Sequence, residues 1–483
     1  MATRSGKMQL LCLCLLSFAV APRNAVAQRP NVIVILADDL GCRDLQVDGS
    51  VFHETPALDA FAQQSVRMTN FYSSHPVCSP TRAALMTGKA PQRLGITDWI
   101  HPASGVALPA EEQTLGEAFR DAGYQTAYFG KWHLGESDAD QPTHHGFEQA
   151  FGVNRAGQPA SYYFPFRRQA DEATIWDVPD FEKGQPHDYL TDVLTQRAID
   201  YLRHRDASRP FLVCLGHYAV HTPIEPPVDL AAKFRIKRES VFHGTPTPTV
   251  PALNDAVSRG RQDSAEYAAM VASLDLNVGR LLQTLTELGL DDNTIVVFTS
   301  DNGGLCTLAG QKPGPTCNLP WRAGKGWLYE GGIRVSCLIR WTNTLQPAML
   351  DVPAYTADLY PTLLELCDLP AQPEQCLDGR SLARALRSEA DPVLTERSLA
   401  WYYPHDHGSG HRAGAAIRRG NWKLVHYFAD NRMELYDLKT DPSETSDVSG
   451  EHPQQLQTLA RALGEWITNT TEQRPDGGRT GDP

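Results

Sequence analysis

A cysteine precedes a predicted helix in residues 75–88, HPVCSPTRAALMTG. Ser79 suits the N-cap position and Pro80 the first helical position, so Cys78 is expected at the N-terminus of this helix. Unpaired N–H groups and the positive end of the helix dipole favour an anion or a thiolate there, and Arg82 follows one turn later on the same side. The pattern predicts a place that binds or attacks a negative group. A half-cystine or a small buried side chain is the alternative.

Polar side chains also follow four apolar segments that we predict to be strands. The segments span residues 31–36, 125–129, 211–215 and 294–299. The polar residues that come after them are, in chain order, Asp38 and Asp39, Lys131 and His133, His217 and His221, and Asp301 and Asn302. Ligands of open α/β sheets bind beyond the carboxyl ends of the strands, so we expect these four groups to converge.

The three carboxylates and the amide carbonyl form a ligand set made only of oxygen. Asp38, Asp39, Asp301 and Asn302 suit a hard divalent cation, calcium or magnesium, and suit zinc poorly. Acidic pairs usually cap helices or lie in solvent. Because both pairs here end apolar strands and are followed by Leu40-Gly41 or Gly303-Gly304, we predict a metal site.

Cationic and titratable residues complete the predicted site. Lys131, Lys325 and Arg82 supply positive charge, while His133 and His221 can exchange a proton near neutral pH. Each alone has an ordinary structural explanation, but together they indicate a pocket for a tetrahedral oxyanion. An unmodified thiolate is a poor nucleophile for a sulfate ester, since its attack would leave a sulfur–sulfur adduct that is hard to discharge.

The alternation of strand and helix patterns predicts the fold class. We expect an α/β fold with a large mixed, mostly parallel sheet sandwiched by helices, which are predicted at residues 56–65, 115–122, 189–203, 265–288 and 355–366. After Leu386 the pattern changes to a small antiparallel sheet and a closing helix at 453–467. We therefore predict a catalytic domain at 28–386 and a C-terminal subdomain at 387–483. Residues 136–184 and 222–260 are expected to be long surface segments that either shape a substrate site or are flexible filler.

The first 27 residues are typical of a secretory signal peptide. They contain Arg4 and Lys7, an apolar run from Leu10 to Ala21 and a small-residue cleavage site at 25–27. The apolar run is short for a membrane anchor, so we expect an exported protein, periplasmic or secreted, with no integral membrane segment after cleavage. Removal of the segment would shift the formal net charge from −13 to −16, which argues against general nucleic-acid binding.

Eight cysteines remain after such a cleavage. Cys306 with Cys317 and Cys367 with Cys376 are close enough in sequence to pair in an oxidising compartment, but the connectivity stays open. If Cys78 is modified, seven cysteines are left, and at least one of them is free or pairs between chains.

The motifs together resemble those of type I sulfatases, the formylglycine-dependent, arylsulfatase-like members of the alkaline phosphatase superfamily. The segment CSPTRAALMTG is similar to their signature, and NVIVILADDLG, YFGKWHLG, HYAVHTP, FTSDNGG, GKGWLYEGGIRV, AIRRGNWKLVHY and ELYDLKTDPSE match further motifs in the same order. The resemblance covers nearly all of the chain that follows the signal peptide. It implies hydrolysis of a sulfate ester.

The resemblance also implies a role for each site residue. Cys78 would be oxidised to Cα-formylglycine by a formylglycine-generating enzyme, and its hydrate would attack sulfur and later expel sulfate. The implied calcium ligands are Asp38, Asp39, Asp301, Asn302 and an oxygen of modified residue 78. Arg82 and His133 would support the hydrate, Lys131 and Lys325 would hold the sulfate, and His221 would protonate the leaving alcohol.

Some positions and the substrate stay open. Cys42 and Arg43 stand where the resemblance leads us to expect aromatic or small residues, and Cys42 is either a disulfide partner or a bystander. Residues 401–412, WYYPHDHGSGHR, either line a sugar subsite or form a packed loop between domains. We expect a sulfated carbohydrate as substrate, with aryl sulfates as artificial ones. Two rival functions are a phosphodiester or phosphonate monoester hydrolase with the same core and a catalytically silent protein that binds sulfated glycans.

Overall fold

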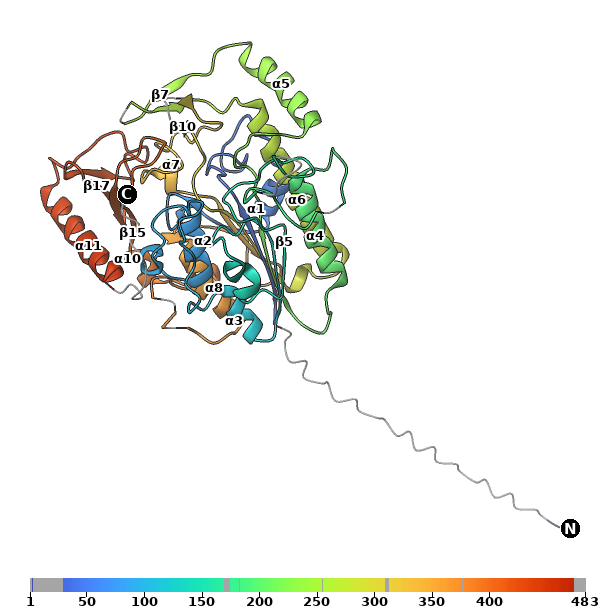
Figure 1. The fold of residues 1–483 in the computed structure, drawn as a ribbon. Coiled ribbons are helices and arrows are strands. Elements are labelled where there is room, and N and C mark those ends of the chain that lie inside the picture. The colour runs from blue at the N-terminus through green and yellow to red at the C-terminus, as the bar shows by residue number, and fades with distance from the viewer. Residues whose placement is uncertain are drawn as a thin grey trace.

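A mixed eight-stranded sheet forms the centre of the molecule in the computed structural model (Figure 1). The structure describes residue 2 and residues 29–472, except 169–173, 182, 254, 309–311, 373 and 376. The strand order is β13-β2-β12-β9-β1-β6-β4-β5. The bounds in chain order are β1 Asn31–Ala37, β2 Val66–Met68, β4 Gln125–Gly130, β5 Gln149–Phe151, β6 Phe211–Gly216, β9 Thr294–Ser300, β12 Cys337–Trp341 and β13 Ala348–Leu350.

Most strand pairs of this sheet are parallel, as the sequence predicts. β1 pairs in parallel with β6 and β9, and β4 pairs in parallel with β5 and β6. The exception is β12, which is antiparallel to both β2 and β9. All four strands predicted from the apolar segments are present and lie side by side in the order β9-β1-β6-β4. The polar residues that follow these strands therefore lie at the same edge of the sheet.

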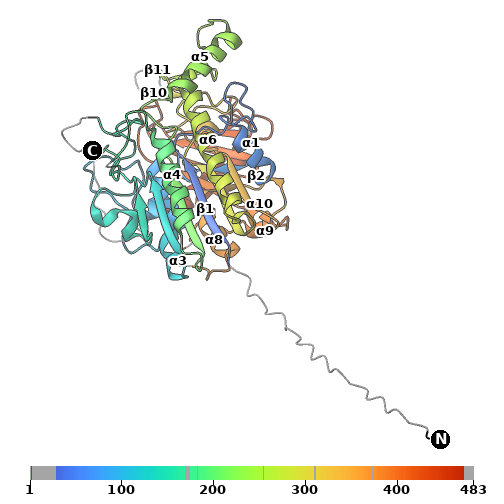
Figure 2. The same ribbon diagram turned by 90° about the vertical axis from the view of Figure 1, so that its right-hand side faces the viewer.

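Helices cover both faces of the sheet. Side chains of β1 alternate between two cores, with Val34 in the core beneath α2, α3 and α8 and Ile35 in the core beneath α1, α4 and α6. Figure 2 shows α4 and α6 lying across their face of the sheet. The bounds are α1 Pro56–Gln63, α2 Cys78–Thr87, α3 Leu115–Asp121, α4 Leu190–His204, α6 Ala265–Glu287 and α8 Leu359–Leu366. The predicted helices are confirmed to within a few residues; α8 starts late because one 3-10 turn, Thr356–Asp358, precedes it.

The predicted cap of α2 is wrong by two positions. The helix begins at Cys78 itself, and Val77 is the N-cap residue, with extended backbone and no side-chain hydrogen bond. The hydroxyl of Ser79 is used elsewhere, because it accepts a hydrogen bond from the backbone N–H of Ile100 at 3.0 Å. Gly88 ends the helix in the left-handed region at φ 72°, as expected.

The segment 222–260 is more ordered than its proline and threonine content suggests. It contains helix α5, Val228–Phe242, which packs on α6 through Ala231 and Phe234. A small antiparallel sheet follows, with order β11-β10-β8-β7 and bounds β7 Thr249–Pro251, β8 Val257–Arg259, β10 Thr307–Leu308 and β11 Lys312–Pro313. Within the described part of 136–184, regular structure amounts to β5 and the short 3-10 turns Asp138–Asp140 and Pro142–His144.

The C-terminal part is an antiparallel sheet backed by one helix, as predicted. Its bounds are β15 Ser398–Tyr403, β16 Gly414–Arg419, β17 Trp422–Tyr427, β18 Arg432–Asp437 and α11 Pro453–Thr471. One face packs on α11 through Leu424 and Leu459, and the other packs on the main body through Trp401 and Tyr329. The remaining short elements are β3 Phe71–Tyr72, β14 Ala354–Tyr355, α7 Glu330–Ile333, α9 Ala383–Leu386, α10 Pro392–Glu396 and the 3-10 turns Pro91–Leu94 and Asp291–Asn293. The domain boundary after Leu386 stays a prediction.

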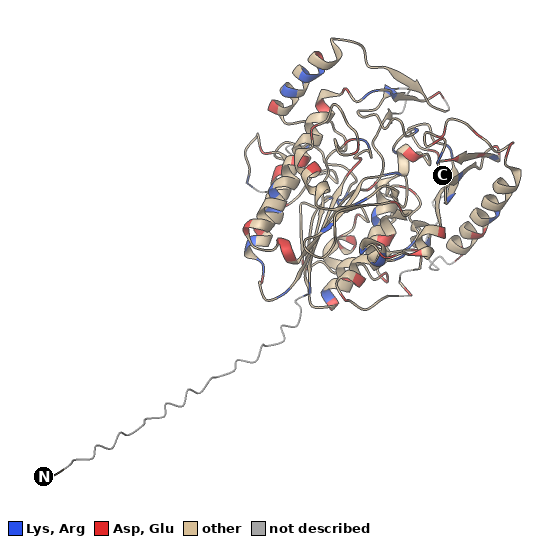
Figure 3. Ribbon diagram, turned by 180° about the vertical axis from the view of Figure 1, so that it is seen from behind, with Lys and Arg blue, Asp and Glu red and all other residues tan. Residues whose placement is uncertain are grey.

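Basic and acidic residues are mixed along the described chain. Figure 3 shows Lys and Arg residues interspersed with Asp and Glu residues along the helices. Over the described residues, no helix combines the length and the apolar character needed to cross a bilayer. The predicted signal peptide lies outside the described residues.

Candidate active site

The carboxyl ends of β1 and β9 bring the predicted oxygen ligands together. Asp38 and Asp39 follow β1, and Asp301 and Asn302 follow β9, its direct neighbour. All four side chains are buried. The backbone N–H of Asp39 donates to Asp301 Oδ1 at 3.2 Å, and Asn302 Nδ2 donates to Asp39 Oδ1 at 2.8 Å. Asp39 takes a left-handed φ of 61°, which turns the chain at the end of β1.

Three cations lie against these carboxylates. Lys131 Nζ, from the loop after β4, donates to Asp38 Oδ2 at 2.7 Å. Lys325 Nζ donates to Asp39 Oδ2 at 3.0 Å. Arg82, one turn into α2, holds Asp301 Oδ2 with both Nε and an Nη, at 2.9 and 2.7 Å. The predicted site residues from five separate segments therefore form one buried network.

Two acceptors in this network have no donor. Asp38 Oδ1 and Asn302 Oδ1 are buried, and neither accepts a hydrogen bond from any described residue. Leaving such atoms unpaired is costly, whereas a hard cation would satisfy them. Ligand atoms of Asp38, Asp39 and His221 also lie within 4.8 Å of one another. The buried acidic cluster is therefore consistent with a metal site, and its oxygen-rich composition fits calcium or magnesium.

The electrostatics of the carboxylates differ from one to the next. Burial raises the pKa of Asp38 well above its usual range, although Lys131 opposes this. Burial also acts to raise the pKa of Asp39, but Lys325 and His221 outweigh it and lower that pKa. Arg82 likewise outweighs burial and lowers the pKa of Asp301. Asp38 is thus the carboxylate with the least compensation from the protein.

Cys78 lies at the start of α2 with its thiol directed at His133. Its Sγ is 3.2 Å from His133 Nδ1, and His133 Nε2 is 3.1 Å from the carbonyl oxygen of Ile100. The carbonyl assigns the ring proton to Nε2, so Nδ1 accepts from the thiol. Burial raises the pKa of Cys78 despite the nearby Lys131 and Lys325. The helix N-terminus and the lysines therefore do not stabilise a thiolate in the unmodified side chain, because desolvation outweighs the local positive charge.

The two histidines that follow β6, His217 and His221, have different surroundings. His221 Nδ1 is 2.9 Å from the carbonyl oxygen of Thr222, and its Nε2 is 3.6 Å from Asp39 Oδ2. Burial and the charge of Lys325 lower the pKa of His221 to about 3, so this imidazole is neutral in the structure. His217 is fully buried, and its ring nitrogens have no hydrogen-bond partner among the described residues. The structure thus places His221, and not His217, at the carboxylates.

Residues near the reaction centre include some that the sequence did not indicate. Trp99 contacts His101 with ring centroids 3.6 Å apart and the planes tilted by 35°, and its ring lies 6.4 Å from that of His133. From the C-terminal part, His405 Nε2 is 3.0 Å from Thr97 Oγ1. The contact of Thr97 with His405 joins segments 308 positions apart. His405 belongs to the segment 401–412 that the sequence offered as a sugar subsite, whereas no local pattern indicated Trp99.

The segment Trp401–Arg412 has features of both alternatives, a packed loop and a sugar subsite. Trp401, Tyr403 and His411 are buried and pack against the main body. His407 is half-buried, and burial together with Lys325 lowers its pKa to about 4. The segment is therefore a packed connection whose half-buried histidines lie near the charged site.

The cysteines form no disulfide within the described part of the chain. Cys42, Cys78, Cys214, Cys306, Cys317, Cys337 and Cys367 are all free thiols. The Cys306–Cys317 pairing is therefore not formed here, and Cys376, the candidate partner of Cys367, lies outside the described residues.

Comparison with known proteins gives consistent matches along the chain. A family model described as Sulfatase matches residues 30–369, and one described as N-sulphoglucosamine sulphohydrolase, C-terminal, matches residues 322–473. Human arylsulfatase A is 31% identical over 93% of this chain and 85% of its own, and a sulfatase of Formosa agariphila is 29% identical over 90% and 87%. The solved structure of Ps i-CgsB in complex with k-i-k-neocarrahexaose superposes with a TM-score of 0.78 at 27% identity, over 94% of this chain and 96% of that one.

Proposed function

Because the chain belongs to the type I sulfatase family of the alkaline phosphatase superfamily and is a sulfuric ester hydrolase, we propose that it removes sulfate from a carbohydrate with a formylglycine made from Cys78. The observation that carries the proposal is the position of Cys78, at a helix N-terminus in the same buried network as Lys131, Lys325 and the carboxylates. Because attack by an unmodified thiol on a sulfate ester would leave a sulfur–sulfur adduct that is hard to discharge, we take the thiol as the substrate for maturation and not as the working nucleophile.

Calcium is the cofactor we propose for the oxygen cluster. Asp38, Asp39, Asp301 and Asn302 would hold it together with an oxygen of modified residue 78, and the two unpaired oxygens support this set. Bound calcium would supply positive charge that stabilises the sulfate oxygens and the oxygens of residue 78. Arg82 fixes the orientation of Asp301 through its two hydrogen bonds, so it positions a ligand.

The remaining residues act on the sulfate ester directly. Lys131 and Lys325 would bind sulfate oxygens, and His133 would hold residue 78 through the contact that its Nδ1 now makes with Sγ. The hydrated aldehyde of formylglycine supplies a hydroxyl for attack at sulfur and a second hydroxyl for release of sulfate. His221 would protonate the leaving alcohol from Nε2, because its Nδ1–H is engaged with the carbonyl of Thr222. Since the imidazole is neutral in the structure, Nε2 would first take up a proton from solvent, which the negative charge of a bound sulfate ester would favour.

A carbohydrate substrate is supported by two observations. Ps i-CgsB, which is 27% identical to this chain, has been solved in complex with k-i-k-neocarrahexaose. In this chain Trp99, His101, His405 and His407 gather beside the reaction centre, and aromatic and imidazole rings of this kind suit a sugar ring. We further propose that the protein is exported, on the strength of its N-terminal segment.

The test begins with the mass of the proteolytic peptide that carries residue 78, from protein produced with a formylglycine-generating enzyme. An aldehyde or its hydrate is expected; an intact thiol despite a competent host would contradict the proposal. The matured protein is then assayed on sulfated mono- and oligosaccharides and on matched aryl sulfate and aryl phosphate esters. Release of sulfate from a sugar is expected. A preference for the phosphate ester, or binding of sulfated sugars without release, would replace our proposal with one of its two rivals.

A further inference from the structure

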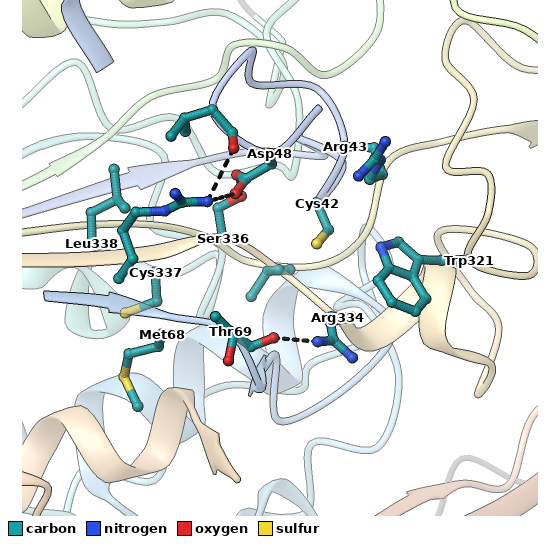
Figure 4. A pocket seen from close by; sticks show the side chains of 13 residues that line it. Cys42, Arg43, Asp48, Met68, Thr69, Trp321, Arg334, Ser336, Cys337 and Leu338 are labelled. Carbon is teal, nitrogen blue, oxygen red and sulfur yellow. Dashed lines mark hydrogen bonds and ion pairs between the residues drawn. The ribbon is translucent and has the colours of Figure 1, made fainter. Parts of the chain in front are cut away.

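A second cavity lies beside the loop that follows the catalytic aspartates. It has a volume of about 280 Å³ and is lined by the loop after β1, by β2 and by the segments around Trp321 and β12 (Figure 4). The lining residues are Cys42, Arg43, Val47, Asp48, Arg67, Met68, Thr69, Trp321, Arg334, Val335, Ser336, Cys337 and Leu338. None of them belongs to the reaction centre. Cys42 and Arg43 are the two positions where the sequence departs from the resemblance.

The charges that line this cavity do not cancel. Three arginines face a single carboxylate, that of Asp48. This carboxylate is already paired, since Arg67 donates to its Oδ1 at 3.0 Å and Ser336 Oγ donates to its Oδ2 at 2.6 Å. Asp48 and Arg67 therefore neutralise each other. The positive charges of Arg43 and Arg334 are not balanced by another carboxylate in the cavity lining.

Arg334 is fixed in place by its own partners. Its guanidinium forms an ion pair with Glu330 at 3.0 Å and donates to the carbonyl of Thr69. It also lies 4.4 Å from the ring of Trp321. Arg334 thus contributes a rigid positive charge and holds the indole against one wall of the cavity.

Arg43 and Trp321 have donor capacity that the described residues do not use. Arg43 forms no ion pair with a described carboxylate, and within the described part of the chain its guanidinium makes one long hydrogen bond, 3.4 Å, to the carbonyl of Gly49. The Nε1 of Trp321 is buried and has no acceptor among the described residues. Figure 4 shows Arg43, Trp321 and Arg334 along one side of the cavity, around the thiol of Cys42. A buried N–H without an acceptor is costly and indicates an unaccounted partner.

We propose that this cavity is a second oxyanion site, which binds free inorganic sulfate through Arg43 and the indole N–H of Trp321. A guanidinium matches two oxygens of a tetrahedral oxyanion, and the indole donates to a third. The rigid charge of Arg334 adds attraction, and the paired Asp48 adds little repulsion. The site is distinct from the one at which the ester is cleaved, so its test does not depend on catalysis.

The test locates and measures sulfate binding directly. Crystals of the whole protein are soaked in selenate, whose anomalous signal marks each site, and inorganic sulfate is titrated calorimetrically. We expect one selenate between Arg43 and Trp321 in addition to any at Lys131 and Lys325. Arg43→Gln should remove it and weaken this binding step at least tenfold, since a charge-assisted contact is lost. Arg419→Gln, which removes an exposed arginine on β16, is the matched control and should bind as the wild type does.

A second variant keeps the proposal falsifiable if Arg43→Gln fails to fold. Trp321→Phe keeps an aromatic ring under Arg334 but removes the N–H, and we expect sulfate to bind several-fold more weakly. Selenate only at the reaction centre, or unchanged affinity in both variants, would overturn the proposal. A parallel titration uses galactose 6-sulfate. Binding of this sugar at the cavity in preference to inorganic sulfate would also overturn it, because the cavity would then be a substrate subsite.

Discussion

Two buried charge clusters in this molecule contain similar residue types but have different roles. The reaction-centre cluster consists of Asp38, Asp39, Asp301, Lys131, Lys325 and Arg82. The anchor cluster consists of Glu330, Glu444, Lys423, Arg334 and Arg418, and it joins α7 of the main body to the C-terminal sheet. Every member of both clusters is largely removed from water.

The difference lies in how completely each cluster satisfies itself. In the anchor cluster, Lys423 Nζ lies 3.0 Å from Glu330 and 2.7 Å from Glu444, and the backbone N–H of Glu330 donates to Glu444 at 2.6 Å. Glu444 Oε1 accepts no hydrogen bond from the described residues, but it is the oxygen that the Lys423 ammonium approaches to 2.7 Å. In the reaction-centre cluster, Asp38 Oδ1 and Asn302 Oδ1 also have no donor, and the ion pair of Asp38 Oδ1 with Arg82 is long, at 4.0 Å. A cluster whose carboxylates share a close cation holds two parts of a protein together, whereas one with buried oxygens that have no close cation can accept a ligand. Mutations in the first should therefore cost stability, and mutations in the second should cost activity.

The largest expected effect is in the reaction-centre cluster. Cys78→Ala removes the precursor of the nucleophile, and we expect kcat/KM to fall by about 10⁴-fold or more. The thermal unfolding midpoint should change little, because Cys78 donates only one weak hydrogen bond. Steady-state kinetics on matured protein and calorimetry give the two readouts. Residual turnover close to that of the wild type would remove Cys78 from the mechanism.

The next effect couples metal and turnover. Asp301→Ala should abolish calcium binding and reduce kcat/KM by on the order of 10³-fold, because a ligand is lost and Arg82 is left without its carboxylate. Calcium content is measured by elemental analysis of dialysed protein. Asp291→Ala, outside the cluster, is the control. Calcium retained at the wild-type level would mean that the ligand set is misassigned.

The corresponding change in the anchor cluster should affect stability instead. Lys423→Met leaves Glu330 and Glu444 buried without their shared cation, which costs about 3–5 kcal/mol of unfolding free energy. The turnover number per folded molecule should stay near the wild-type value. Urea denaturation and active-site titration separate the two quantities. A stable Lys423→Met protein with impaired chemistry would reverse the contrast between the clusters.

The reaction-centre cluster could be predicted from the sequence and the anchor cluster could not, for a physical reason. The reaction-centre residues each follow an apolar strand, and the topology of a parallel sheet carries such positions to one edge, so Asp38 and Asp301 could be found locally. The antiparallel placement of β12 was not predicted, because it depends on pairing with the distant strands β2 and β9. Helix α5 was not predicted, because the proline- and threonine-rich composition of 222–260 conceals it. The anchor cluster was missed altogether, since nothing near Glu330 or Lys423 marks their meeting across 93 positions.

A smaller effect tests the role of His221 within the reaction-centre cluster. His221→Ala should reduce kcat/KM by about 10²–10³-fold for alkyl or sugar sulfates, whose leaving oxygen needs a proton. For activated aryl sulfates, which leave as stable phenolates, the loss should be several times smaller. The ratio of the two losses is the measurement. Equal losses on both substrates would show that His221 is not the acid.

The smallest expected effect is a change in the pH dependence of stability, and it comes from the anchor cluster. Burial raises the pKa of Glu444 from 4.5 to about 7, because Glu330 adds repulsion and Lys423 compensates only partly. The folded state then keeps a proton that the unfolded state releases, so the contribution of Glu444 is complete below pH 4.5 and is lost as the pH rises to about 7. The pKa of Glu330 is instead lowered to about 2, since Lys423 and Arg334 outweigh its burial, and its contribution changes only below pH 4.5.

Glu444→Gln has no titrating group at this position. Comparison with the wild type therefore isolates the contribution of Glu444 to the pH dependence of stability. Between pH 4.5 and 7 the wild type should lose up to about 3 kcal/mol of unfolding free energy through this group, and the variant should lack that loss. Urea denaturation at pH 4.5, 6 and 7.5 measures it, with the exposed Glu451→Gln as control. If both variants keep the wild-type slope, Glu444 is ionised throughout. The anchor cluster would then tolerate two buried carboxylate charges around Lys423 without a bound ion, and incomplete neutralisation alone would no longer mark the reaction-centre cluster as a ligand site.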